Sequence, residues 1–243
     1  MRSTGLRPPR SALLTALLAA VVTAAALAGV VLLRPHPDTD GGDGAAAAPS
    51  ASPPPPTSTC GAGPCHQLAA MTVGSTPVVL LDSAQGGAGR VRIGPEPGIT
   101  IELTIAEMGV RLGKDSLRCI EGSTSACLIR GEANDAAGGS YGELIVNRGG
   151  TWEDSGKPYF ADAGTLSLYD VSADGAPDVI VVRHECPGST PGTPTCQASP
   201  VLAEVYDLTG TSMGCTWKVT SPSELRGWPD VRLTRADLHA CPS

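Results

Sequence analysis

Aromatic side chains are scarce in this sequence of 243 residues, which contains one Phe, four Tyr and three Trp. A core without large rings must be built from Val, Leu, Ile and Ala, which bury less area per residue. We therefore expect disulfides to compensate for the small core side chains. In so aromatic-poor a chain, we interpret Trp152, Trp217 and Trp228 as core anchors, with a sugar-binding platform as the alternative.

Basic side chains are outnumbered in the larger part of the chain. From Cys60 onward, 13 Lys and Arg residues stand against 21 Asp and Glu residues, which gives a net charge of −8. A protein that follows the phosphates of a nucleic acid needs a positively charged surface. The sequence therefore predicts no nucleic-acid partner.

Zinc-ligand spacings are absent from the sequence as well. No C-x-x-C pair occurs, and the four histidines are scattered along the chain at His36, His66, His184 and His239. Structural zinc sites recognisable from sequence use closely spaced Cys and His ligands. We interpret the histidines as surface or hydrogen-bonded residues and expect another role for the cysteines.

The longest apolar run, residues 12–33, predicts a transmembrane anchor. It contains no charged residue and would form a helix about 33 Å long, enough to cross a bilayer core. Arg2, Arg7 and Arg10 precede the run, and by the positive-inside rule they place residues 1–11 in the cytoplasm. The protein would then be single-pass in the cell membrane, with its C-terminal domain outside.

A cleaved signal peptide is the alternative, because Ala26 to Ala28 form an A-x-A-like site, and cleavage there would give a secreted protein. Under either interpretation the remainder of the chain is exported. Residues 34–59 are rich in Pro, Ala and Gly and contain almost no large apolar side chain, so we expect a disordered stalk. Residues 60–243 would form one extracellular domain.

All eight cysteines lie in the exported part, and an even number outside the cell predicts disulfides. Sequential pairing closes mostly short loops rich in Gly, Pro, Ser and Thr. The predicted bonds join Cys60 to Cys65, Cys119 to Cys127, Cys186 to Cys196, and Cys215 to Cys241.

The pattern of the exported part is that of a mainly β fold. Short β-branched or alternating runs are separated by Gly, Pro, Asp and Ser, which is typical of antiparallel strands. These runs lie at 75–82, 89–94, 98–105, 141–147, 164–170, 177–182, 201–208 and 215–219. Helical signals are confined to 66–71 and to 234–240, where Thr234 and Asp237 resemble a capping box.

A candidate metal loop lies between two of these runs, in the sequence DVSADGAPDVIVV at 170–182. If Asp170 occupies the first place, oxygen-bearing side chains fall at places three, five and nine, and Gly175 falls at place six, as in calcium loops. Two positions depart from the pattern, because Ser172 is neutral and Val181 replaces the bidentate Glu of place twelve.

This loop and the apolar strand after it resemble the FG-GAP or VCBS type of repeat, which occurs in integrin-like β-propellers. Upstream, ELIVNRGGTWEDSG at 143–156 is similar to that family's strand and glycine turn, so that residues 141–183 resemble one repeat. The resemblance implies a calcium ion (Ca²⁺) that braces a β-hairpin. Its implied ligands are Asp170, Ser172, Asp174, Asp178 and the Ala176 carbonyl.

Only one copy of the loop is visible in the sequence. At roughly 40 to 50 residues per blade, a domain of this length holds at most about four blades. We therefore expect a small or degenerate propeller, or another antiparallel β domain. A plain Asp-Gly turn remains the alternative to calcium, but three carboxylates within nine residues repel one another without a cation, which favours the metal.

A second candidate site is the G-x-S-x-G pattern at 210–214, where Ser212 is followed by Asp230 or Asp237 and by His239. A nucleophile elbow joins a strand to a helix, whereas the strand-like run 215–219 follows here. The pattern therefore favours a hairpin turn.

Together these features predict a membrane-tethered extracellular binding module, not an enzyme, with a structural calcium loop and an envelope component or other extracellular ligand as its partner. A secreted serine hydrolase that uses Ser212 is the alternative. The composition and layout resemble those of exported actinobacterial proteins.

Overall fold

The computed structural model describes residues 59–60, 63–134 and 138–242. The expected cytoplasmic segment, the anchor at 12–33 and all of the stalk except Thr59 lie outside these residues. Thr59 pairs with Pro64 at the edge of a sheet. Within the described residues, no helix has the length and apolarity needed to cross a bilayer.

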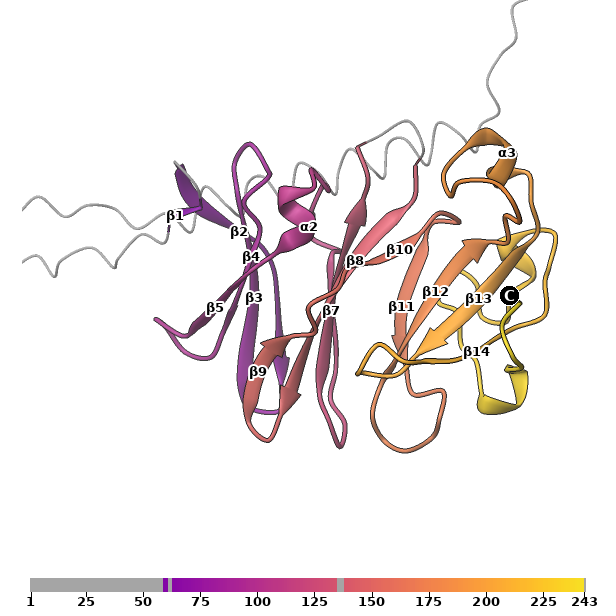
Figure 1. Cartoon of the computed structure of the whole chain (residues 1–243). Helices are drawn as coiled ribbons and strands as arrows, with labels where there is room; N and C mark the ends of the chain where they lie inside the picture. The colour runs from indigo at the N-terminus through magenta and orange to yellow at the C-terminus, as the bar shows by residue number, and fades with distance from the viewer. Residues whose placement is uncertain (1–58, 61–62, 135–137, 243) are drawn as a thin grey trace, which may run out of the picture. The chain divides into compact units, whose positions relative to one another are not determined.

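Three antiparallel sheets follow one another in chain order, from left to right in Figure 1. Sheet 1 contains β1 (Thr59–Cys60), β2 (Gly63–Val73), β3 (Thr76–Ser83), β4 (Arg90–Ile93) and β5 (Ile99–Glu102). Sheet 2 contains β6 (Leu117–Ile120), β7 (Ala126–Glu132), β8 (Ser140–Arg148), β9 (Thr151–Asp154) and β10 (Tyr159–Ala161). Sheet 3 contains β11 (Thr165–Tyr169), β12 (Asp178–His184), β13 (Val201–Tyr206) and β14 (Ser212–Cys215). The expectation of a mainly β, antiparallel domain is confirmed.

Strand order is sequential in sheets 1 and 3, in which each strand pairs with the next one along the chain. Sheet 2 differs because β9 and β10 both pair with β8, at its two ends. Short connections of this kind join antiparallel neighbours without a crossover. The turn at 148–151 between β8 and β9 is the glycine turn noted in the sequence, and Gly150 N–H donates to Asn147 Oδ1 at 2.9 Å.

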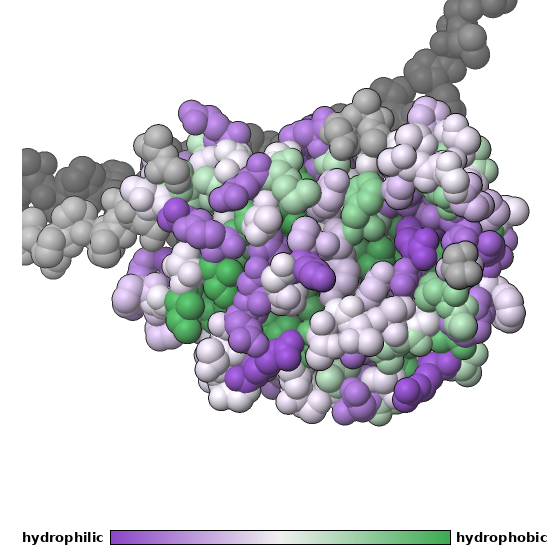
Figure 2. Space-filling model, in the orientation of Figure 1, coloured by the Kyte–Doolittle hydropathy of each residue, from purple (hydrophilic) through white to green (hydrophobic). Residues whose placement is uncertain are grey.

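Sheet 2 is apolar on both faces, because successive side chains of a strand point to opposite sides. Ile145 of β8 belongs to the buried cluster that contains Leu80 of sheet 1. Its neighbour Leu144 belongs to the cluster that contains Val179 of sheet 3. The two clusters hold the three sheets together. On the surface, Figure 2 shows apolar residues between hydrophilic ones on one face of the molecule.

The C-terminal segment covers the other face of sheet 3. Ile180 and Val182 of β12 share a buried cluster with Leu225, Val231 and Leu233. Strand β12 is therefore buried on both sides, which explains its unbroken apolar sequence where a half-exposed strand would alternate.

Helices within the described residues are short, namely α2 (Thr104–Glu107), α3 (Pro194–Gln197) and the 3-10 turns η1 (Pro222–Glu224) and η2 (Arg235–Asp237). At η2 the Asp237 carboxylate accepts a hydrogen bond from the Thr234 N–H at 2.7 Å, as the capping pattern predicts. The helix expected at 66–71 is wrong, because these residues lie in β2 and pair with β3. Pairing with a neighbouring strand overrides a weak local preference for helix.

Disulfide pairing is sequential, as predicted. The bonds join Cys60 to Cys65, Cys119 to Cys127, Cys186 to Cys196, and Cys215 to Cys241. Cys119 and Cys127 are direct partners in the β6–β7 ladder. The bond between Cys215 and Cys241 fastens the C-terminal segment to β14, which positions the groove described below.

Candidate functional site

The predicted calcium loop connects β11 to β12, and Asp178 is the first residue of β12. The Asp178 side chain is buried, and its Oδ2 accepts hydrogen bonds from the N–H groups of Val171 (2.9 Å) and Ser172 (3.0 Å). Burial raises the pKa of Asp178, although these two amides oppose the shift. The carboxylate thus closes the base of the loop.

The remaining side chains of the loop also turn toward its own backbone. Asp170 accepts hydrogen bonds from the N–H groups of Asp174 (3.2 Å) and Gly175 (3.0 Å). Asp174 Oδ1 accepts one from Ala176 N–H at 2.8 Å, and the Ser172 hydroxyl lies 3.5 Å from Asp170 Oδ1. These are the contacts of an Asp-rich turn, in which amide dipoles offset the repulsion between carboxylates.

The described residues contain two groups of three or more metal-ligating side chains whose ligand atoms lie within 4.8 Å of one another. The predicted calcium loop at 170–178, called the acidic loop below, is not one of these groups. Asp170, Asp174 and Asp178 are therefore not gathered around one centre. As it stands the loop does not fit a calcium ion, because the carboxylates would first have to rotate away from the amides. Calcium binding stays a prediction.

The G-x-S-x-G serine is the first residue of β14, and residues 216–221 contain no helix. The strand expected at 215–219 is wrong, because β14 ends at Cys215 and Val219 forms only an isolated bridge to Val201. Ser212 Oγ donates to Glu204 Oε1 at 3.0 Å. Asp237 accepts from Thr234, and His239 Nδ1 lies 2.7 Å from the Ala240 carbonyl. Each side chain of the candidate triad thus has a different partner, so this geometry does not supply the serine with a histidine base.

The tryptophans differ from one another in a way that the sequence did not indicate. Trp152 is buried, as expected of a core anchor, but the same expectation is wrong for Trp217 and Trp228. Trp217 is 76% exposed, the highest exposure among the large apolar residues that the structure describes as exposed. An indole held in solvent loses the hydrophobic gain of burial, which makes it a candidate contact for a ligand.

Trp217 lines a groove of about 750 Å³ together with Thr216, Lys218, His239 and Pro242. The indole and the His239 imidazole lie against each other, with ring centroids 3.9 Å apart and planes tilted by 40°. Pockets of this volume accommodate small molecules. Leu202 and Ala240 also line the groove, which therefore offers a mainly apolar surface with the indole of Trp217 beside a few polar side chains.

Backbone pairing fixes both walls of this groove. Cys215 and His239 exchange two hydrogen bonds of 2.9 Å, and the disulfide to Cys241 lies directly beside them. On the other side of Trp217, Val219 and Val201 exchange two hydrogen bonds of 2.8 Å. Trp217 is thus presented from a rigid backbone and not from a free loop.

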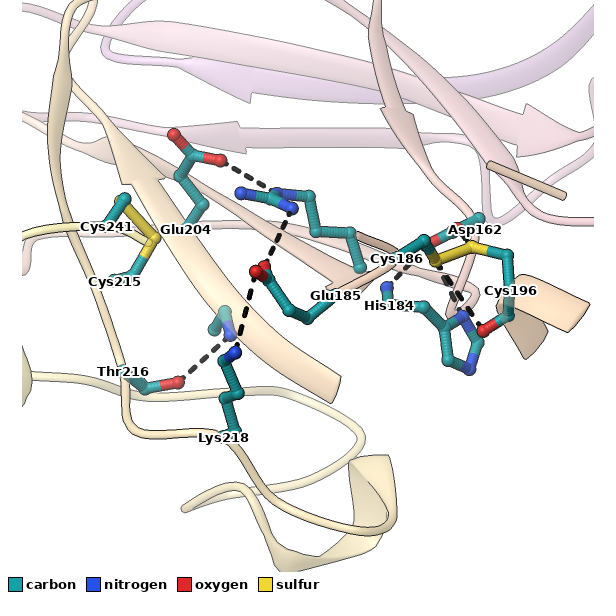
Figure 3. A network of polar contacts seen from close by, with 12 residues as sticks. Asp162, His184, Glu185, Cys186, Cys196, Glu204, Cys215, Thr216, Lys218 and Cys241 are labelled. Carbon is teal, nitrogen blue, oxygen red and sulfur yellow. Dashed lines mark hydrogen bonds and ion pairs between the residues drawn. A yellow bond between two sulfur atoms is a disulfide. The ribbon is translucent and has the colours of Figure 1, made fainter. Parts of the chain in front are cut away.

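A chain of ion pairs lies beside the groove (Figure 3). Arg183 Nε is 2.8 Å from Glu204 Oε2, and its Nη1 is 3.6 Å from Glu185 Oε2. Lys218 Nζ is 3.5 Å from Glu185 Oε1. Because Lys218 is exposed and this contact is long, its ammonium group remains available to a ligand.

Glu143 is a buried acidic residue that the sequence did not indicate. It lies on β8 and is 1% exposed. Its Oε2 accepts a hydrogen bond from the Ile105 N–H at 3.1 Å, and its Oε1 is buried without a partner. Burial, with a contribution from Asp154, raises the pKa of Glu143 to about 7. The alternating pattern of β8 gave no signal for it, because a single Glu in a strand normally faces water.

Comparison of the chain with family models, with curated proteins and with solved structures found no match.

Proposed function

We propose that this protein is a binding module, not an enzyme, and that the Trp217 groove holds a saccharide ring of an extracellular or envelope component. One observation carries the proposal, namely the 76% exposure of an indole that is rigidly held beside polar side chains. The predicted anchor at 12–33 would tether the module to the membrane, and cleavage within that run would instead release it.

The chemistry of the groove suits a sugar. The C–H groups on one face of a pyranose ring pack against an aromatic face, while its hydroxyls need hydrogen-bond partners. Trp217 supplies the aromatic face, and Lys218 and Thr216 supply polar groups beside it. Thr216 Oγ1 accepts a hydrogen bond from Ala203 N–H at 3.0 Å, and this contact does not use the proton of the Thr216 hydroxyl.

We further propose a propeller-like repeat and a structural calcium ion. Three successive antiparallel sheets, of which two are simple meanders, are compatible with a small propeller-like arrangement of the FG-GAP type. Within it, calcium at Asp170, Ser172, Asp174, Asp178 and the Ala176 carbonyl would serve as a structural brace, once the carboxylates turn from the loop amides toward the ion. A serine hydrolase is not proposed, because no geometric observation favours Ser212 as a nucleophile.

The test is retention of the full-length protein on insoluble polysaccharides and on purified bacterial cell-wall sacculi. We expect wild-type protein to be retained and Trp217→Ala to lose at least about tenfold in affinity, since stacked aromatic contacts in a binding site are frequently dominant contributors. Trp228→Ala removes another exposed indole outside the groove and serves as the matched control.

Equal retention of Trp217→Ala and wild type would overturn the groove as the site. Failure of every polysaccharide to retain the wild-type protein would overturn the saccharide class.

A further inference from the structure

A second cluster of reactive side chains lies at the other end of β12 from the acidic loop. It contains Asp162, from the loop between β10 and β11, His184, the last residue of β12, and the disulfide between Cys186 and Cys196 (Figure 3). Asp162 and His184 are 22 residues apart in sequence and meet only because β11 and β12 form a hairpin. Sequence spacing therefore gave no sign of the cluster.

The Asp162 carboxylate is almost completely removed from solvent, with 2% of its side chain exposed. Its Oδ1 accepts a hydrogen bond from the His184 N–H at 2.7 Å. Its Oδ2 lies 3.3 Å from Cys196 Sγ. A sulfur atom in a disulfide carries no proton, so in this state Cys196 cannot donate to the carboxylate. A buried carboxylate without enough donors is costly, and such groups are normally paired or bound to a metal.

The imidazole of His184 is in a similar position. Its Nδ1 is buried, lies 3.5 Å from Asp162 Oδ1 and has no hydrogen-bond partner. A nitrogen and an oxygen that can both ligate a metal therefore face each other at the end of β12, next to two sulfur atoms.

The separations agree with those between ligands of one metal ion. Ligand atoms of Asp162, Cys186 and Cys196 all lie within 4.8 Å of one another. His184 is not part of this group, so its imidazole has to turn toward the sulfurs to share an ion with them. In a tetrahedral zinc site with bonds of about 2.0 Å to nitrogen or oxygen and about 2.3 Å to sulfur, neighbouring ligand atoms are about 3.3–3.8 Å apart. The distance from Asp162 Oδ2 to Cys196 Sγ (3.3 Å) and the distance from Asp162 Oδ1 to His184 Nδ1 (3.5 Å) fall in this range, with one carboxylate oxygen facing each of the two residues.

We propose that reduction of the Cys186–Cys196 disulfide creates a zinc site, in which Zn²⁺ is bound by Asp162, His184, Cys186 and Cys196. A dithiol reductant supplies two electrons and two protons, becomes a disulfide itself and leaves both cysteines as thiols. Zn²⁺ then displaces the two thiol protons into solvent and binds the thiolates. The metal gives the buried carboxylate a direct ligand bond in place of the missing donors, and the two sulfurs move apart into separate coordination positions.

Another group of a carboxylate and two disulfide sulfurs provides a comparison within the same molecule. Glu204, Cys215 and Cys241 also place their ligand atoms within 4.8 Å of one another. Glu204, however, already pairs with Arg183 at 2.8 Å and accepts from the Ser212 hydroxyl at 3.0 Å. Its charge is therefore compensated, so the argument from an unsatisfied carboxylate applies to Asp162 and not to Glu204.

Access to the disulfide is open on one side. Cys186 is half-buried and is followed by the exposed Pro187 and Gly188, whereas Cys196 is fully buried. A reductant would therefore attack Cys186 and release Cys196 beside Asp162, where the new thiol can donate to the carboxylate until the metal binds.

The proposal is tested with Co²⁺ as a spectroscopic substitute for Zn²⁺. The full-length protein is reduced, freed of reductant without air and titrated with Co²⁺. We expect one equivalent to give a sulfur-to-cobalt charge-transfer band with the visible bands of tetrahedral cobalt, and Zn²⁺ to abolish both. Oxidised protein should give neither.

Variants separate this site from the other six cysteines. The double variant Cys186→Ser/Cys196→Ser should lose the bands, and Asp162→Asn or His184→Gln should weaken Co²⁺ binding by at least about tenfold. Glu204→Gln, at the comparison cluster, should leave the titration unchanged.

One further variant avoids reduction of the structural disulfides. Cys186→Ser leaves Cys196 as a buried thiol beside Asp162 while the other three bonds stay closed, and we expect it to bind Co²⁺ with a single-thiolate band. Absence of this band, or bands that persist in the double variant, would overturn the proposal.

Discussion

Glu143 shows how one residue can make stability depend on pH. Its carboxyl group lies in the middle sheet, where it accepts the Ile105 N–H at the start of α2 and leaves Oε1 without a partner. Burial disfavours the charged form, so that the pKa of Glu143 rises from 4.5 to about 7. The protonated acid is therefore the form that suits the fold.

We predict that this protein loses stability as the pH rises from about 4.5 to about 7. The folded-state pKa of Glu143 lies above its unfolded value of 4.5. The stabilisation from its protonated carboxyl group is therefore fully present below pH 4.5 and is lost as Glu143 ionises in the folded state. The loss amounts to about 3 kcal/mol, because a difference of one pKa unit corresponds to about 1.4 kcal/mol. Urea unfolding of wild type and Glu143→Gln across this pH range measures it.

The glutamine variant should remove most of the difference between acidic and alkaline pH, whereas Glu132→Gln, at an exposed position, should retain it. Parallel pH profiles for wild type and Glu143→Gln would contradict the assignment.

At the scale of elements, three hairpin loops contact one another in a row. The turn between β2 and β3 touches the β6–β7 loop, where Gly74 N–H donates to Glu121 Oε2 at 2.9 Å. The β6–β7 loop in turn touches the acidic loop, where Ser123 N–H donates to the Gly175 carbonyl at 2.8 Å. Each sheet therefore supports its neighbour through loops as well as through the core.

We predict that Gly122→Ala separates two of these loops. A Cβ at position 122 would lie 2.2 Å from the Gly175 carbonyl oxygen, a backbone atom that cannot move aside easily. The expected cost is about 1–3 kcal/mol of unfolding free energy, as for other overpacked sites. Gly113→Ala is the control, because a Cβ there meets nothing within 4 Å. Equal melting temperatures for the two variants would contradict the contact.

The acidic loop yields a second prediction at this scale. If calcium binds with a dissociation constant near 10⁻⁴ M, then about 1 mM calcium stabilises the protein by about 1.4 kcal/mol, or roughly 3–5 °C in melting temperature. Chelation should remove this gain, and Asp174→Ala should abolish the sensitivity to chelator. Asp207→Ala, in a comparable Asp turn between β13 and β14, should keep it. A wild-type melting curve indifferent to chelator would remove the calcium prediction.

At the scale of the whole molecule, the three sheets pack against one another in chain order, and the C-terminal segment packs on the remaining face of sheet 3. Leu225, Val231 and Leu233 cover sheet 3, so that its apolar face is not left in water. The Cys215–Cys241 bond holds the end of this segment against β14, next to the groove residues His239, Ala240 and Pro242. Stability and the candidate binding surface therefore depend on the same bond.

We predict that loss of this bond costs more than loss of the N-terminal one. The two bonds close sequence separations of 26 and 5 residues, for which the chain-entropy model gives about 3.5 and about 2 kcal/mol. Chemical unfolding of Cys215→Ser/Cys241→Ser and of Cys60→Ser/Cys65→Ser measures the difference. Only the first variant should also impair retention on polysaccharide, and the reverse order of stabilities would contradict the model.

The sequence by itself determined the mainly β class, the sequential disulfides and several strands, although not β2, the longest strand among the described residues, or β7. These features rest on local information, because side-chain alternation, turn residues and short cysteine separations act over a few residues. The strand at 177–182 and the capping contact at Thr234 were predictable for this reason.

Only the tertiary structure decided what each polar or aromatic side chain faces. Trp152 and Trp217 have the same chemistry, yet one is buried between strands and the other stands in solvent. Asp162 meets His184 through a hairpin, and Glu143 is buried because its strand is covered on both faces. Burial and electrostatic environment depend on contacts between distant segments, and a linear pattern does not contain them.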